Sequence, residues 1–266
     1  MGNKRQQLLE QMNEWCQKDI CVALSGGVDS SLLLKLATDA ANKNGKKVYA
    51  ITFDTVLHPR QDVKVAAAIA QEMGAIHKII EVNELNHPKI KNNDKDRCYY
   101  CKTMLFENII DFAKERQIAT IIEGTNHDDL SQYRPGIRAI RELGILSPLA
   151  QYGFTKVEVR QWAKDEGVSV SKRPSAPCLA TRLPYDTLVD VALLKRIEQG
   201  ENLLRGLGFL NVRLRVHQEV VRLEVDEVML KEVLRQKEVI ITNLKELGFK
   251  YITMDLLGFY SGSMDI

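Results

Sequence analysis

The chain has 266 residues and a formal net charge of +2 at pH 7, with 27% charged and 6% aromatic residues. This length suits one large domain, or a medium-sized domain followed by a smaller one. The near-neutral charge gives no reason to expect a nucleic acid partner, and no apolar run approaches the ~18 residues of a membrane span. The N-terminal residues lack the apolar core of a signal peptide, so we expect a cytoplasmic protein that is not bound to a membrane.

Predicted helices and strands alternate through the first two thirds of the chain. The spacing of apolar residues predicts helices at residues 4–17, 30–41, 61–73 and 155–166, with another around Leu105, Ile109 and Phe112. Runs rich in Val and Ile predict strands at residues 20–24, 47–53, 78–82 and 120–123. Such alternation is typical of βαβ units. We therefore predict an α/β fold whose parallel sheet has helices on both faces.

The pattern changes after residue 170. A loop punctuated by prolines at positions 174, 177 and 184 is longer than a simple connection needs. Beyond it we predict a long helix to residue 206, strands at residues 211–217 and 219–226, one or two helices, and a last strand at residues 250–256. The predicted organisation is a first domain at residues 1–170, a cysteine-containing loop at 171–184 and a smaller C-terminal α/β domain at 185–266.

Residues 25–30, with the sequence SGGVDS, join the first predicted strand to a leucine-rich helix. Adjacent glycines let the backbone approach a ligand closely, and Ser25 and Ser30 add hydroxyl groups. The following helix presents its unpaired N–H groups and the positive end of its dipole to the turn. The stretch is neither a Walker A loop nor a dinucleotide-binding G-x-G-x-x-G motif. It predicts a binding site for a phosphate chain.

Polar residues also follow two other predicted strands. Asp54 follows the second strand, and residues 124–129, with the sequence GTNHDD, follow the fourth. Because ligands of parallel sheets bind at the carboxyl ends of the strands, we expect these residues to lie near residues 25–30. Their carboxylates could bind Mg²⁺ or accept hydrogen bonds from a nucleotide. They could equally be helix N-caps.

The five cysteines divide into two groups. Cys98 and Cys101 form a C-x-x-C pair, and Cys178 lies in the proline loop. In a reducing compartment this spacing indicates metal binding or catalysis rather than a disulfide. Three thiolates are one fewer than the four that usually hold a 4Fe-4S cluster or a structural zinc, which leaves one position open. Cys16 and Cys21 lie on predicted core faces, and we expect them to pack as small apolar side chains.

Arg213 and Arg215 alternate with apolar residues in a predicted strand, so they share one face. Arg222 and Glu224 of the next strand are expected on the same side. A solvated face with ion pairs across the strands would explain this pattern. A pair of arginines is also suited to binding a phosphate or carboxylate. The residues alone leave both interpretations open.

Residues 25–30 resemble the loop of the N-type ATP pyrophosphatases, the PP-loop superfamily with the fold of adenine nucleotide alpha hydrolases. These enzymes cleave ATP between its α and β phosphates. The resemblance implies that pyrophosphate and ATP are bound by Ser25, Gly26, Gly27, Asp29 and Ser30, with Asp29 near Mg²⁺. It extends the ATP site to Asp54, Gly124, Asn126 and Asp128.

Residues 25–30, 124–129, 173–182 and 212–217 together resemble the LarE family of ATP-dependent sulfur transferases, which help to make the nickel-pincer nucleotide of lactate racemase. The resemblance implies adenylation of a carboxylate of pyridinium-3,5-biscarboxylic acid mononucleotide, followed by conversion to a thiocarboxylate. Better-known members donate the sulfur of a single cysteine that matches Cys178. Because Cys98 and Cys101 are also present, the chain resembles the branch in which these three cysteines hold a 4Fe-4S cluster that carries sulfide.

The same resemblance implies further site residues and partners. Substrate binding is expected from Arg182, Glu201, Arg213 and Arg215, and catalytic roles from Cys178 and Asp29. Sulfide or another sulfur donor would supply the sulfur, and relatives form homohexamers, so we expect a homo-oligomer. The competing hypotheses are sacrificial donation by Cys178, a cluster-dependent tRNA thiolase, an ammonia-using synthetase and a nucleotide sensor without turnover.

Overall fold

The computed structural model describes residues 2–174, 176–260 and 262–264. Contacts within it divide the chain into two compact units with one sheet each. The first unit is Met1–Thr55, Arg60–Glu84 and Asp96–Ala176, and the second is Val56–Pro59, Leu85–Lys95 and Pro177–Ile266. Among the described residues, no helix is both long enough and apolar enough to cross a membrane.

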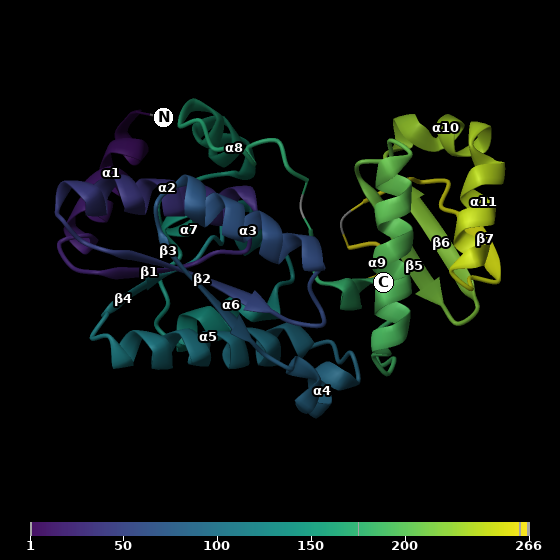
Figure 1. Ribbon diagram of the computed structural model, residues 1–266, viewed down its shortest axis with the longest axis horizontal. Helices are drawn as coiled ribbons and strands as arrows, with labels where there is room; N and C mark the ends of the chain where they lie inside the picture. The colour runs from purple at the N-terminus through teal and green to yellow at the C-terminus, as the bar shows by residue number, and fades with distance from the viewer. Residues whose placement is uncertain (1, 175, 261, 265–266) are drawn as a thin grey trace. The chain divides into compact units, whose positions relative to one another are not determined.

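The first unit contains a parallel sheet with helices on both faces, as predicted. Its strands, in the spatial order β3-β2-β1-β4, are β1 (Ile20–Ala23), β2 (Val48–Asp54), β3 (Ile76–Glu81) and β4 (Thr120–Ile122). The helices are α1 (Gly2–Trp15), α2 (Val28–Lys43), α3 (Arg60–Glu72), α5 (Arg97–Glu115), α6 (Pro135–Glu142), α7 (Pro148–Gln151) and α8 (Lys156–Asp165). Figure 1 shows α2 and α3 on one face of this sheet and α5 and α6 on the other.

Two apolar cores lie on the two faces of this sheet. Val22 of β1 packs into the core that includes α1, α2, α3 and α8, whereas its neighbour Cys21 packs with α5. Successive side chains of a strand point to opposite faces, so β1 supplies both cores. Cys16 and Cys21 are fully buried, as predicted. Helices α6 and α7 were not predicted, because eight and four residues are too few to show helical spacing.

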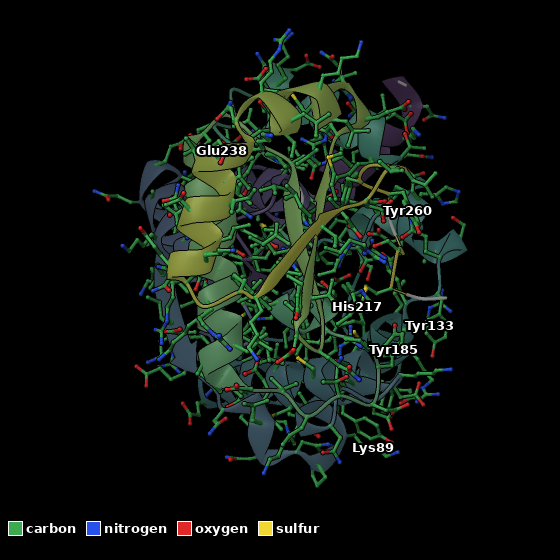
Figure 2. All side chains as sticks on the ribbon, turned by 90° about the vertical axis from the view of Figure 1, so that its right-hand side faces the viewer. Lys89, Tyr133, Tyr185, His217, Glu238 and Tyr260 are labelled. Atoms are coloured by element: carbon green, nitrogen blue, oxygen red, sulfur yellow. The ribbon has the colours of Figure 1, made fainter. Side chains whose placement is uncertain are left out.

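The second unit is a smaller α/β structure. Its sheet has the order β5-β6-β7, in which β5 (Val212–His217) is antiparallel to β6 (Val220–Val225), and β7 (Tyr251–Met254) is parallel to β6. The helices are α4 (Pro88–Lys91), α9 (Val191–Gly206), α10 (Leu230–Arg235) and α11 (Lys237–Glu246). At Gly200 a Cβ would lie 2.6 Å from the Leu214 side chain, so glycine lets α9 approach the sheet closely. Figure 2 shows Glu238 of α11 and Tyr260 on opposite sides of this sheet.

The second unit also includes two short segments that the sequence placed within residues 1–170. The Leu179 N–H donates to the Leu57 carbonyl at 2.7 Å. The Asn93 side chain donates to the carbonyls of Leu183 and Pro184 at 3.2 and 2.7 Å. These long-range hydrogen bonds hold Val56–Pro59 and Leu85–Lys95 against the loop after Cys178, and nothing in local sequence indicates them.

Candidate functional site

The turn between β1 and α2 has the geometry of an anion-binding loop. Gly26 has φ of +73°, a conformation that favours glycine. The Ser25 N–H donates to the Ser30 hydroxyl oxygen at 3.2 Å, and the Ser31 hydroxyl donates to the Gly27 carbonyl at 2.8 Å. Gly27 caps α2 without a side chain. The first turn of α2 therefore keeps its N–H groups directed at the loop, where the helix dipole favours an anion.

Asp29 connects this loop to residues 124–129. Its Oδ1 accepts a hydrogen bond from the Asn126 side-chain amide at 3.1 Å, and its Oδ2 pairs with the Lys156 ammonium group. At Gly124 a Cβ would lie 2.9 Å from the Ser30 nitrogen, so only glycine lets the two loops approach this closely. The structure thus brings Asp29, Gly124 and Asn126 together at the carboxyl ends of β1 and β4.

The other residues of this loop form a polar network. The side-chain oxygen of Asn126 accepts a hydrogen bond from the Asp128 N–H at 3.0 Å. The Asp128 carboxylate accepts one from the Lys156 N–H at 2.8 Å. Asp129 pairs with Arg134 at 2.9 Å. Burial raises the pKa of Asp129, although Arg134 acts in the opposite direction. The hydrogen bond from the Lys156 N–H to Asp128 helps to fix the start of α8, and the Lys156 side chain reaches Asp29 from there.

Asp54 lies at the end of β2, where its carboxylate pairs with Arg60 at 3.3 Å. The Arg60 side chain is largely exposed, whereas the Asp54 side chain is partly buried. The sequence placed Asp54 at the same edge of the sheet as residues 25–30, and the structure adds Arg60 as its partner. Its role in binding ATP stays a prediction.

Arg173 contacts the anion-binding loop from the start of the proline loop. Its guanidinium group donates to the Gly26 carbonyl at 2.7 Å and to Asp62 at 2.5 Å. Arg160 of α8 holds the backbone around Arg173 by donating to the carbonyls of Ser171 and Arg173. Arg173 therefore fixes the orientation of the Gly26–Gly27 peptide.

Cys98 and Cys101 lie in the first two turns of α5, three positions apart, and such positions share a helix face. Both are partly exposed thiols. Helix α6 packs closely here, because a Cβ at Gly136 would lie 3.3 Å from the Cys98 carbonyl oxygen. Tyr99 fixes the turn further by donating to Glu142 of α6 at 2.6 Å.

Cys178 lies in the second unit, directly before the short turn Leu179–Arg182, and is also a partly exposed thiol. Its carbonyl accepts hydrogen bonds from the Thr181 hydroxyl at 2.8 Å and from Arg182 at 3.3 Å. Arg215 donates to the Thr181 carbonyl at 2.7 Å. The backbone after Cys178 is therefore held from several sides.

Arg182 and Glu201 form a fully buried, bidentate ion pair. The Arg182 Nε and Nη2 donate to the two Glu201 oxygens at 2.7 and 2.9 Å, and both side chains are 1% exposed. The Leu214 N–H and Arg205 also donate to Glu201. Burial opposes ionisation of Glu201, but the arginines outweigh it and hold the pKa of Glu201 below its usual value.

Arg213 and Arg215 share one face of β5, and Arg222 and Glu224 lie opposite them on β6. Glu224 accepts from Arg215 and Arg222, each at 3.0 Å. The ion pair across the strands that the sequence allowed is therefore present, but the face is not solvated, since Arg213 is 3% and Arg215 5% exposed. Burial, followed by repulsion from Arg182, lowers the pKa of Arg213 to about 10, so it remains charged at neutral pH.

The C-terminal residues explain this burial. The Phe259 ring lies 5.1 Å from the Arg213 guanidinium group, and the Ser263 hydroxyl donates to Glu224 at 2.7 Å. These contacts are on the sheet face opposite α11, where Figure 2 shows Tyr260. Arginines outnumber carboxylates within this cluster, which consists of Arg182, Arg205, Arg213, Arg215, Arg222, Glu201, Glu224 and Asp255. The excess positive charge suits an anionic ligand.

The donor atoms fit the metal groups expected from the sequence. By chemical type, cysteine sulfurs suit an iron–sulfur cluster and the Asp29 carboxylate suits Mg²⁺. In the part of the chain that the structure describes, no group of three or more His, Cys, Asp or Glu side chains is arranged to hold a metal ion.

Sequence reasoning missed Lys156 and Arg173 beside the anion-binding loop. Lys156 is separated from Asp29 by more than a hundred residues. It is the first residue after a helix N-cap, a position at which a lysine gives no sign of a functional role. Arg173 was noticed only as part of the loop that carries Cys178. Their partners become visible only when the loops are placed in three dimensions.

Three comparisons with known proteins give results that agree with one another. A family model described as a PP-loop domain matches residues 2–133. A pyridinium-3,5-bisthiocarboxylic acid mononucleotide synthase of Lactiplantibacillus plantarum is 33% identical over 92% of this chain and 88% of its own length. An uncharacterised protein of Synechocystis sp. is 35% identical over 92% of this chain and 91% of its own. The structure of the NMN synthetase of Francisella tularensis matches with a TM-score of 0.50 at 16% identity, covering 65% of this chain and 74% of that one, which shows a common fold.

Proposed function

The chain belongs to the LarE family of PP-loop enzymes, which are ATP-dependent sulfur transferases, and we propose that it acts on pyridinium-3,5-biscarboxylic acid mononucleotide. In the first step a substrate carboxylate attacks the α phosphorus of ATP, and pyrophosphate leaves. In the second step sulfur attacks the adenylated carbonyl carbon, the bond to AMP breaks, and a thiocarboxylate remains. The observation that carries this proposal is the 33% identity, over 92% of the chain, to a synthase of the corresponding bisthiocarboxylate.

The geometry around Asp29 supports the first step. The N–H groups at the start of α2 are oriented to stabilise charge on the leaving pyrophosphate. Asp29 is the carboxylate that would hold Mg²⁺, with Asn126 fixing its orientation at 3.1 Å. The Lys156 ammonium group, which pairs with Asp29 here, would then be available to a phosphate oxygen.

The buried arginine cluster supports binding of an anionic substrate. We assign Arg213 and Arg215 to a phosphate or carboxylate of the mononucleotide, which would have to displace the C-terminal contacts of Phe259 and Ser263 to reach them. Arg182 and Glu201, whose polar atoms contact one another and the backbone, keep this face ordered. The expectation of a homo-oligomer stays a prediction.

For the sulfur source we propose a 4Fe-4S cluster held by Cys98, Cys101 and Cys178. Such a cluster, when bound, supplies an iron site that can carry sulfide for transfer. The chain's own contribution is three thiols that are partly exposed and a backbone around Cys178 that is fixed by Thr181 and Arg182. Sacrificial donation of the Cys178 sulfur is the alternative for the same reaction.

Release of pyrophosphate tests the adenylation step. With ATP, Mg²⁺ and the pyridinium mononucleotide, we expect equal amounts of AMP and pyrophosphate from the wild type. Asp29→Asn should slow their release ~100-fold, because it removes a charged group at the reacting phosphates. Release that depends on tRNA and ignores the mononucleotide would instead identify a tRNA thiolase, and ATP binding without release would identify a nucleotide sensor.

Anaerobic purification tests the source of sulfur. Iron and acid-labile sulfide should be present in the wild type and lost in a Cys98→Ser/Cys101→Ser variant, with a visible absorption band that follows them. Active protein without iron, which loses the mass of hydrogen sulfide after one turnover, would show the sacrificial route. Stoichiometric zinc would contradict both sources.

A further inference from the structure

Asn93 is a buried residue that connects helix α4 to the loop after Cys178. It is fully buried and has φ of +53°, a left-handed conformation that asparagine adopts more readily than most residues. Its Nδ2 lies 2.7 Å from the Pro184 carbonyl oxygen, 3.2 Å from that of Leu183 and 3.4 Å from that of Ala180. One side-chain amide therefore faces three carbonyls of one short loop.

The backbone around Asn93 strengthens the same connection. The Asn93 carbonyl accepts from the Asp186 N–H at 3.2 Å, and the Lys91 carbonyl accepts from the Val189 N–H at 2.8 Å. The Asn93 Oδ1 is buried without a hydrogen-bond partner among the described residues, which carries a free-energy cost. An apolar side chain would avoid that cost but could not donate to the loop.

The loop held by Asn93 begins directly after Cys178. Ala180 lies in the turn Leu179–Arg182, whose first residue follows the cysteine. The Leu179 N–H is held by the Leu57 carbonyl at 2.7 Å, and the Thr181 N–H donates to the Cys178 carbonyl at 3.1 Å. Loss of the Asn93 donors would therefore free the far end of the turn that orients the Cys178 thiol.

We propose that Asn93 is a positioning residue for sulfur transfer, which acts by holding the backbone that carries Cys178. This inference rests on the proposed function, in which Cys178 takes part in the second step. The side-chain hydrogen bonds of Asn93 are made within the second unit, whereas the residues assigned to ATP belong to the first. Its loss should leave adenylation intact and uncouple it from formation of the thiocarboxylate.

Asn93→Gly tests this proposal, because glycine adopts the same φ without strain and removes both donors. Asn93→Ser is a second variant in case the glycine variant unfolds, and Asn92→Ala, which changes the exposed neighbouring side chain, is the matched control. We expect Asn93→Gly to release pyrophosphate at nearly the wild-type rate but to form thiocarboxylate ~10-fold more slowly, because small displacements of reacting groups greatly reduce rates.

Alkylation of Cys178 gives a readout that does not depend on activity. In the full-length, metal-free, reduced protein, iodoacetamide labelling followed by peptide mass spectrometry should show Cys178 reacting several-fold faster in Asn93→Gly than in the wild type or Asn92→Ala. Equal loss of both reaction steps, or unchanged alkylation and sulfur transfer, would overturn the proposal. If the wild type forms no thiocarboxylate at all, the proposed function fails, whereas the alkylation rates still decide whether Asn93 holds Cys178.

Discussion

At the scale of single residues, the Asp29 carboxylate has a partner for each oxygen. Asn126 donates to Oδ1 at 3.1 Å, and Lys156 pairs with Oδ2. Mg²⁺ at this carboxylate would compete with the Lys156 ammonium group, because the two positive charges repel each other. Lys156 is the partner that can be exchanged usefully, since its ammonium group can move to a phosphate oxygen as the metal takes its place.

Replacing Lys156 with methionine should therefore impair adenylation. We expect pyrophosphate release to fall between ~10-fold and ~100-fold, because a positive charge near the leaving group is lost. Lys164→Met, on the exposed side of the same helix, is the control and should leave the rate unchanged. Equal rates in both variants, measured at saturating ATP, would show that Lys156 only stabilises the loop.

The cysteines should differ sharply in reactivity. Burial raises the pKa of the Cys16 thiol to about 11 and that of Cys21 to about 12, so almost no thiolate is present at pH 8. In the folded, metal-free, reduced protein we expect iodoacetamide to label Cys98, Cys101 and Cys178 while Cys16 and Cys21 stay unmodified until urea is added. Mass spectrometry of the peptides measures the labelling. Modification of Cys21 in the absence of urea would contradict its burial.

At the scale of elements, the start of α8 is fixed by a capping box. The Thr155 side chain and Glu158 satisfy each other's backbone N–H groups, and Glu158 also pairs with Lys4 at 2.6 Å. The hydrogen bond from Lys4, followed by that from Thr155, lowers the pKa of Glu158 to about 2. Helix α8 carries Lys156 in its first turn, so this cap supports the pairing of Lys156 with Asp29.

The contacts of Glu158 predict how the stability of the folded protein changes at acidic pH. The folded-state pKa lies below the unfolded value of 4.5, so the stabilisation is complete above pH 4.5 and is lost as the pH falls towards 2. Urea unfolding should therefore show a stability difference between the wild type and Glu158→Gln that shrinks over this range. Glu10→Gln, on the exposed side of α1, should show no such trend, and a difference independent of pH in Glu158→Gln would contradict the assignment.

The buried pair of Arg182 and Glu201 joins the turn after Cys178 to helix α9. Removing one partner of a buried ion pair leaves an uncompensated charge, so Arg182→Met should lower the free energy of unfolding by about 3 kcal/mol. Arg205→Met, which removes the partly exposed partner of the same carboxylate, should cost about 1 kcal/mol or less. Urea denaturation of both variants measures this, and similar losses would show that burial of Arg182 adds nothing.

At the scale of the whole molecule, the sequence predicted those features of the fold that depend on residues close together in the chain. The Val- and Ile-rich strands, the glycine turn and the cap of α8 follow from neighbouring residues, and the structure confirms the parallel sheet that they predicted. Contacts between distant segments were not predictable in this way. The pairing of Asp29 with Lys156, the hold of Asn93 on the loop after Cys178 and the burial of Arg213 under Phe259 all join residues whose local sequence shows no sign of the partner.

The two units divide the proposed chemistry. The first contains the PP-loop and the Cys98–Cys101 pair, and the second contains Cys178 and the buried arginines. In the proposed reaction, the loop assigned to ATP and the arginines assigned to the substrate therefore lie in units with separate apolar cores. Variants in the core of one unit should leave the fold of the other unit unchanged.

The product of the complete reaction tests the central claim most directly. The protein is incubated anaerobically with ATP, Mg²⁺, sulfide and pyridinium-3,5-biscarboxylic acid mononucleotide, and the nucleotide products are identified by mass spectrometry. We predict a product in which sulfur has replaced a carboxylate oxygen, together with one AMP and one pyrophosphate for each sulfur introduced. Release of ADP and phosphate, or AMP formation with no sulfur in the mononucleotide, would contradict the account.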